Sequence, residues 1–304
     1  MKEEEVIQSY IDYLSKQKMY SNHTVSAYLN DINIFNKYVT NEDYSLFAVD
    51  TTVIRNFLEN QLLDGISKRS LKRRLVSLHG FYSFMKEKNI IKINPFINIT
   101  SPKTDRKLPD FLYEEEIKKL FDENLKREDP YMSRDQAIIE LLFASGLRVS
   151  ELCSIKLNNI QLKQRFIRVI GKGKKERIVP FSLSAQAAID MYMKTLRMDL
   201  INKKNSKHDN HLFLNEYGNP LTSRGVQYIL NSIESKLGLG MDLHPHKFRH
   251  TFATTMLDRG ADLRTIQEIL GHESLSTTQV YTHISSKKMK EDYSKYFPRS
   301  KKED

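Results

Sequence analysis

Apolar residues return at every third or fourth position through most of the chain, a spacing that places them on one face of an α-helix. The first 93 residues contain four such segments, and we predict a helix for each. Their apolar faces are marked by Val6, Ile7, Tyr10, Ile11 and Leu14; by Val25, Tyr28, Leu29, Ile32 and Phe35; by Val53, Ile54, Phe57 and Leu62; and by Leu71, Leu75, Leu78, Tyr82 and Met85. Residues that favour a helix start precede the last three, at Ser21 or Asn22, at Asp50 or Thr51, and near Ser67.

Residues 94–110 show no apolar period and carry three prolines, Pro95, Pro102 and Pro109. Because proline stiffens the backbone and cannot continue a helix, this composition is typical of a semi-rigid linker. We therefore predict two domains, residues 1–93 and 111–304, joined by the linker 94–110. A length of 304 residues is sufficient for two domains of ordinary size.

The second domain is predicted to be mostly helical, with one hairpin. Two runs rich in β-branched residues, 166–170 and 176–181, flank the sequence GKGKK, whose glycines permit a tight turn. Helical spacing occupies most of the remainder: 117–121, a segment from 137 to Gly146, one opened by Arg148, about 183–200, 222–237, 246–257 and 262–270. The expected fold class is therefore mainly α, with a small antiparallel β-sheet.

The chain is basic, with a formal net charge of +10 and a pI near 9.3. This charge favours an anionic partner, and nucleic acid is the first candidate. One face of the fourth predicted helix carries five basic residues: Lys68, Arg69, Lys72, Arg73 and Arg74. Such a row is commonly a solvated surface, but beside the motifs below we interpret it as phosphate contacts, which position a protein on DNA without reading its sequence.

Cys153 is the single cysteine, so an internal disulfide is excluded and a reducing compartment is favoured. It lies in an apolar run, which predicts a buried structural thiol. The first residues, MKEEEVIQSY, are acidic and amphipathic, unlike a secretion signal, and no apolar run is long enough to span a membrane. We expect a cytoplasmic protein without a membrane partner.

Residues 244–283 bring together side chains suited to attack on an anion. His246 and Arg249 are three apart at the head of one predicted helix, so they share a face. Gly271 is placed to end the next helix and to turn His272 away from it. Tyr281 follows nine residues later. A guanidinium, two imidazoles and a phenol carried toward one point form a site for an anion that is to be attacked.

These residues occur as HKFR, LGH and YTH, an order that resembles the C-terminal signature of the tyrosine recombinase (phage-integrase) family, and within it the Xer type. That signature is accompanied upstream by an arginine in an S-G-L-R-x-S-E-L segment and a lysine in a G-K-G-x-K-E-R hairpin. Both are present, as SGLRVSEL with Arg148 and GKGKKER with Lys172. The resemblance spans nearly the whole chain.

The resemblance implies a four-helix, SAM-like N-terminal DNA-binding domain that clamps the duplex together with a catalytic domain. It assigns Tyr281 as the nucleophile and Lys172 as the general acid, with His246 accepting the phenol proton or bonding the phosphate. Arg148 and Arg249 would stabilise the phosphate charge, and His272 would hydrogen-bond to the scissile phosphate. Strand cleavage through a 3′-phosphotyrosyl bond requires neither a cofactor, ATP nor a metal.

The resemblance also implies partners and a role in the cell. The expected substrate is double-stranded DNA with a recombination target of paired half-sites, bound by a homo- or heterotetramer with a related recombinase. The expected role is the resolution of chromosome dimers before segregation at cell division. A septal DNA translocase is a further candidate partner.

Three alternatives remain open at the level of the sequence. A phage or transposon integrase without an arm-binding domain would carry the same motifs, and a topoisomerase-type nickase would use similar chemistry. The pattern of His244, His246 and His250 also allows a metal-dependent hydrolase, although that reading leaves Arg148 and Tyr281 unexplained.

The last residues carry a short apolar stripe, because Met289, Tyr293 and Phe297 follow one another at intervals of four. A stripe at the end of a chain can fold back onto its own domain. The family resemblance implies instead that it docks on a neighbouring subunit, and we adopt that expectation.

Overall fold

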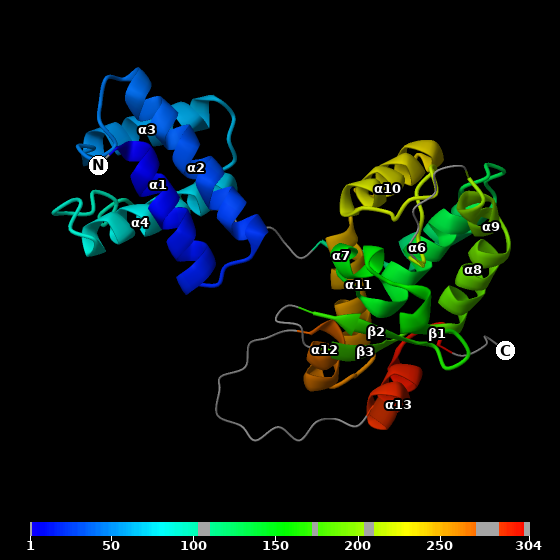
Figure 1. The fold of residues 1–304 in the computed structure, drawn as a ribbon. Helices are drawn as coiled ribbons and strands as arrows, with labels where there is room; N and C mark the ends of the chain where they lie inside the picture. The colour runs from blue at the N-terminus through cyan, green and yellow to red at the C-terminus, as the bar shows by residue number, and fades with distance from the viewer. Residues whose placement is uncertain (1, 103–109, 172–175, 204–209, 272–285, 301–304) are drawn as a thin grey trace. The chain divides into compact units, whose positions relative to one another are not determined.

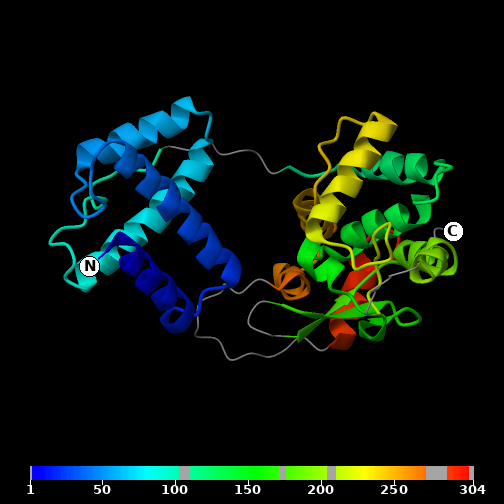
Figure 2. The ribbon, with the colours of Figure 1, turned by 45° about the horizontal axis from the view of Figure 1, so that its top comes forward.

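The computed structural model describes residues 2–102, 110–171, 176–203, 210–271 and 286–300, and of residues 286–288 the backbone alone. Two compact units are present, Met1–Arg106 and Lys107–Asp304. Figures 1 and 2 show the helices of each unit and the small sheet of the second. The predicted mainly α fold with a small antiparallel sheet is confirmed.

The first unit contains the four predicted helices. They are α1 (Glu3–Asp12), continued by a π-helical turn over Tyr13–Gln17, α2 (Asn22–Asn41), α3 (Thr51–Leu63) and α4 (Lys68–Glu87). Ser21, Asp50 and Ser67 accept hydrogen bonds from backbone amides in the first turns of α2, α3 and α4. The sequence had predicted helix starts at these places because a cap is a local feature.

The beginning of the predicted linker is part of this unit. Phe96 is buried, and its ring lies 5.6 Å from that of Phe35 and 4.8 Å from that of Tyr82. The Asn94 amide donates to the carbonyl of His79 and to the Ser83 hydroxyl, at 3.3 and 2.9 Å. Residues 94–96, which begin the stretch predicted as a semi-rigid linker, are therefore packed onto α4. The signal in the sequence was Phe96, an apolar residue between Pro95 and Pro102.

The second unit is built around α6 (Met132–Ser145), which is buried along its length from Ser133. It packs against α5 (Glu114–Leu125), α8 (Leu183–Lys194), α9 (Leu196–Ile201) and α11 (Pro245–Asp258). The other helices described in the second unit are α7 (Val149–Cys153), α10 (Ser223–Leu237), α12 (Leu263–Leu270) and α13 (Ser286–Tyr296), with a 3-10 turn over Leu157–Asn159. Cys153 on α7 is half-buried, and burial raises the pKa of its thiol to about 11.

The predicted hairpin is present as β2 (Phe166–Ile170) and β3 (Glu176–Pro180), paired antiparallel with Ile167 opposite Val179. A two-residue strand, β1 (Ile160–Gln161), adds to the free edge of β2. Alternate residues of β2 are buried, so one face of the sheet joins the core. β3 contacts both α12 and α13.

One helix was predicted over about 183–200, whereas the structure has two. The backbone leaves the helical region at Thr195, with φ −112° and ψ −108°. The Thr195 hydroxyl lies 2.7 Å from the Met191 carbonyl and 3.1 Å from the Ser133 hydroxyl. These side-chain bonds hold the break between α8 and α9, and the contact with α6 could not be seen from local periodicity.

The C-terminal stripe packs on its own unit, so the expectation that it docks on a neighbouring subunit is not met in this chain. Met289, Tyr293 and Phe297 are buried in the core of the second unit. The Tyr293 hydroxyl donates to the Ala144 carbonyl at 2.7 Å, and the Phe297 ring lies 5.1 Å from that of Phe143. Burial of three large side chains stabilises this position by several kcal/mol, on the order of 2 for each.

Gly146 ends α6 in the left-handed region, at φ +58°. A Cβ atom there would lie 2.7 Å from side-chain carbons of Leu270 and Phe252, far closer than packed carbons approach. We expect Gly146→Ala to lower the free energy of unfolding by about 3 kcal/mol, from left-handed strain together with overpacking. Denaturant unfolding measures this loss.

Gly238→Ala is the matched control for that measurement. Gly238 ends α10 at φ +59°, but no atom lies within 4 Å of the position of a new Cβ. Its loss should therefore be confined to the strain, about 1–2 kcal/mol. Equal losses at the two glycines would show that packing around Gly146 is less restrictive than the distances indicate.

Candidate active site

The first part of the site lies where α6 ends and α7 begins. Arg148 is the N-cap residue of α7, and its backbone amide donates to the Glu151 carboxylate at 2.8 Å. The Arg148 guanidinium also donates to Glu151, at 3.1 Å. This capping arrangement turns the Arg148 side chain toward the end of α12, where its Nη2 lies 3.1 Å from the Gly271 carbonyl oxygen.

The second part is the first turns of α11. Pro245 occupies the first turn, and the His244 Nδ1 atom accepts the Lys247 backbone amide at 3.1 Å. Arg249 is buried, with 9% of its surface exposed. Its two terminal nitrogens donate to the carbonyls of Gly146 and Leu270, at 2.7 and 2.8 Å.

Two predicted site residues, Arg148 and Arg249, are thus brought together at the end of α12. That helix ends at Gly271, which has φ +67° as the sequence predicted for a C-cap. The carbonyls of residues 270 and 271 are acceptors that the helix leaves free, and the two guanidiniums bond to them. Positive charge is therefore concentrated at Gly271, the residue that precedes His272 in the sequence.

The electrostatics of the site fit an anionic substrate. Burial, and after it the nearby charge of Arg148, lower the pKa of Arg249 to about 10. At neutral pH the guanidinium therefore stays charged. Partial burial, and then the charge of Arg249, lower the pKa of His246. Its imidazole is consequently neutral at pH 7 and able to accept a proton.

Three predicted site residues, Lys172, His272 and Tyr281, lie outside the described residues. In the sequence, Lys172 lies between the end of β2 at Ile170 and the start of β3 at Glu176, and His272 directly follows Gly271. Their proposed roles remain predictions from the sequence.

Sequence reasoning missed two charged residues that hold the site together, Glu151 and Arg177. Arg177 on β3 donates to both carboxylate oxygens of Glu151, at 2.8 and 2.9 Å. Both residues lie within the quoted motifs SGLRVSEL and GKGKKER. The signal that could have found Glu151 is its spacing of three from Arg148, which is that of a capping box.

The basic row of α4 divides into two groups. Lys68, Arg69 and Lys72 are exposed. Arg73 is also exposed, but it binds Asp31 of α2 through two nitrogens, at 2.5 and 2.7 Å. Arg74 is buried and lies 3.3 Å from the same carboxylate. These last two arginines join α4 to α2 through Asp31, so a phosphate contact rests chiefly on Lys68, Arg69 and Lys72.

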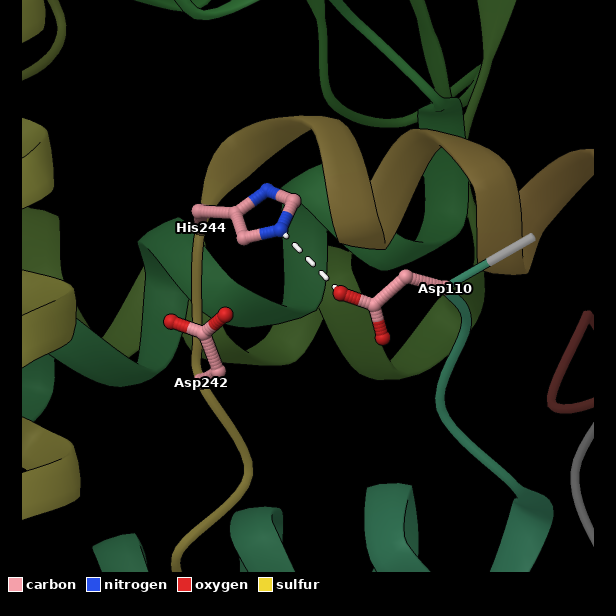
Figure 3. Close-up of side chains that lie close together, drawn as sticks. All are labelled: Asp110, Asp242 and His244. Atoms are coloured by element: carbon pink, nitrogen blue, oxygen red, sulfur yellow. Dashed lines mark ion pairs between the residues drawn. The ribbon is translucent and has the colours of Figure 1, made fainter. Parts of the chain in front are cut away.

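The described residues do not support a metal site formed by His244, His246 and His250. Figure 3 shows the group of metal-ligating type found there, Asp110, Asp242 and His244, which includes neither His246 nor His250. The His244 Nδ1 atom accepts a backbone amide, and its Nε2 lies 3.4 Å from Asp110. Since Lys247 also binds Asp110 at 2.7 Å, an ammonium already neutralises this carboxylate. Both ring nitrogens of His244 are engaged, so His244 and Asp110 form part of the network at the start of α11.

Two family models match the sequence. They are "Phage integrase family", over residues 110–288, and "Phage integrase, N-terminal SAM-like domain", over residues 7–89. A tyrosine recombinase XerC of Oceanobacillus iheyensis is 42% identical over 295 residues, which cover 97% of this chain and 96% of that protein.

The chain belongs to the phage integrase family, as a Xer-type tyrosine recombinase.

A second relative and a solved structure also resemble this recombinase. A tyrosine recombinase XerC of Bacillus subtilis is 39% identical over 297 residues, covering 97% of this chain and 96% of that protein. A solved structure of the XerH site-specific recombinase bound to palindromic difH substrate, in a post-cleavage complex, has a TM-score of 0.68 and 26% identity. It covers 89% of this chain and 79% of that one. The predicted enzyme class, a site-specific recombinase, is confirmed. Within the described residues, no helix has the length and apolar character needed to cross a membrane.

Proposed function

We propose that this recombinase cuts and rejoins double-stranded DNA through a 3′-phosphotyrosyl intermediate at Tyr281. The observation that carries the proposal is the meeting of Arg148 and Arg249 at the C-terminal end of α12. Attack on a phosphodiester builds negative charge on its non-bridging oxygens, and fixed guanidiniums stabilise that charge without a metal ion.

The proposed reaction exchanges one phosphorus–oxygen bond for another. The Tyr281 oxygen forms a bond to phosphorus while the bond from phosphorus to the 5′ oxygen breaks. His246 accepts the phenol proton, in agreement with its lowered pKa, and Lys172 donates a proton to the leaving 5′ oxygen. His272 hydrogen-bonds to the phosphate. Attack by the 5′-hydroxyl of a partner strand reverses these steps and releases Tyr281.

We further propose a target of paired half-sites bound by four subunits, identical or drawn from two related recombinases, with chromosome-dimer resolution as the role. Lys68, Arg69 and Lys72 of α4 would contact phosphates. Support comes from the relatives named XerC and from the XerH structure bound to difH substrate. A cytoplasmic location and a septal DNA translocase as an accessory partner belong to the same proposal.

The test is recombination of a plasmid that carries two copies of the target, with purified protein in excess EDTA. Joint molecules and covalent protein–DNA complexes should form at the same rate with and without the chelator, because arginines take the place of a metal. Relaxation of supercoils without joint products would indicate a nickase. Loss of cleavage on chelation, with recovery on adding zinc or magnesium, would instead support the metal-dependent hydrolase.

Lys172→Ala should slow strand cleavage by about 100-fold or more, since a general acid commonly contributes 10²–10⁴-fold. A substrate with sulfur in place of the bridging 5′ oxygen provides the measurement. A thiolate leaves without a proton, so the variant should cleave this substrate nearly as fast as the unaltered protein does. A variant that is equally slow on both substrates would mean that Lys172 contacts DNA and another group is the acid.

A further inference from the structure

All three guanidinium nitrogens of Arg177 donate hydrogen bonds within the site. Its Nη1 and Nη2 atoms donate to the two oxygens of Glu151, at 2.8 and 2.9 Å, and its Nε donates to the Ile269 carbonyl at 2.8 Å. Only 12% of the side chain is exposed. The residue therefore joins strand β3, helix α7 and the last turn of α12 at one point.

Glu151 is the carboxylate that Arg148 and Arg177 share. Its side chain is 6% exposed, and burial by itself would raise its pKa; hydrogen bonds from Arg177 and from the Arg148 backbone lower the pKa below its ordinary value. Glu151 is consequently charged at neutral pH. A buried carboxylate of this kind binds a guanidinium strongly when two parallel hydrogen bonds are possible.

The geometry shows which arginine makes those two bonds. Arg177 spans both oxygens, whereas the Arg148 guanidinium makes one bond to Glu151 at 3.1 Å. Another Arg148 nitrogen donates to the Gly271 carbonyl, and 38% of the side chain remains exposed. Because Arg177 occupies the carboxylate, Arg148 keeps donors that an incoming phosphate can take.

Arg177 also lies against the turn that ends α12. A Cβ atom at Gly271 would be 3.1 Å from the Arg177 Cζ, so the guanidinium fits there because residue 271 is glycine. With Nε bonded to the Ile269 carbonyl, Arg177 supports the backbone that the two other arginines contact.

We propose that Arg177 is a positioning residue, which binds Glu151 in a bidentate manner and so keeps Arg148 available to the scissile phosphate. The inference rests on the proposed function. Without Arg177, both carboxylate oxygens of Glu151 become available to Arg148. The Arg148 guanidinium then makes two parallel hydrogen bonds to Glu151 and is withdrawn from the substrate.

The experiment measures covalent-complex formation on a target DNA that traps the cleaved intermediate, at saturating DNA. Arg177→Ala should slow the reaction by about 100-fold, comparable to removal of one charge-stabilising donor, while the Kd for DNA changes by about twofold or less. Adding Glu151→Gln to that variant should restore the rate at least about tenfold, because a neutral amide cannot hold Arg148 as a carboxylate does.

Arg168→Ala is the matched control. Arg168 is an exposed arginine of β2, and the register places it on the sheet face opposite that of Arg177. This control should react at nearly the rate of the unaltered protein. If Arg177→Ala unfolds below the assay temperature, Arg177→Lys replaces it. Lysine keeps the positive charge but cannot donate two parallel hydrogen bonds. We therefore expect the rate of covalent-complex formation to fall about tenfold, and Glu151→Gln to relieve this loss.

The outcomes separate the two proposals. If the unaltered protein forms no covalent complex with DNA, the proposed function fails. If it does, but Arg177→Ala reacts as fast as Arg168→Ala, or the double variant is as slow as Arg177→Ala, Arg177 is not a positioning residue for Arg148.

Discussion

The Tyr281→Phe variant is expected to bind target DNA like the unaltered protein and to form no covalent protein–DNA complex. Only the attacking oxygen is removed, so the loss of cleavage should be complete within detection, while contacts to DNA phosphates persist. Denaturing gels of labelled DNA after incubation with each protein measure the covalent complex, and a mobility-shift titration measures binding.

Tyr228→Phe is the control for that change, because Tyr228 is an exposed tyrosine of α10. It should leave both binding and covalent-complex formation unchanged. A covalent band that persists in Tyr281→Phe would assign the nucleophile to a different side chain.

Arg249→Lys should lower the rate of strand cleavage by about 10²–10³-fold, the range found when one charge-stabilising donor is lost. Lysine retains a positive charge, but it cannot present two donors in a fixed plane to the carbonyls of Gly146 and Leu270 and to a phosphate. Lysine is preferable to alanine here, because alanine would remove the Arg249 donor from the Gly146 carbonyl and leave the Leu270 carbonyl only a 3.5 Å bond from Arg148, and would lower the stability by about 2–3 kcal/mol or more.

Arg197→Lys provides the comparison for Arg249→Lys. Arg197 is also buried, and it donates to the carbonyls of Leu212 and His211, at 3.1 and 2.8 Å. The two substitutions should lower thermal stability to a similar extent, whereas only Arg249→Lys should slow cleavage at saturating DNA. Equal cleavage rates in the two variants would show that Arg249 is a structural residue.

The sequence predicted features that depend on neighbours along the chain. Caps at Ser21 and Asp50 act within one helical turn, and the hairpin of β2 and β3 follows from two β-branched runs around glycines. The motifs also indicated Arg148 and Arg249 without any knowledge of the fold.

Features that depend on distant contacts were not predicted. The helix break at Thr195 is held by a residue of α6, and Arg177 meets Ile269, which lies 92 positions away along the chain. The two residues of β1 are too few to produce a period. The spacing of the C-terminal stripe predicted a covered face, but not that the face packs on its own unit in this chain, because an amphipathic pattern indicates that a surface is covered without indicating what covers it.

The single cysteine has a consequence for labelling chemistry. A thiol with a pKa of about 11 is almost entirely protonated at neutral pH, with roughly one thiolate in ten thousand, so maleimide dyes react slowly with Cys153. Cysteines introduced at exposed acidic positions, such as Glu59 on α3 and Asp199 on α9, would react far faster. A donor and an acceptor fluorophore at these two places, one in each compact unit, would report by energy transfer whether the distance between the units changes on DNA binding, without first removing the native cysteine.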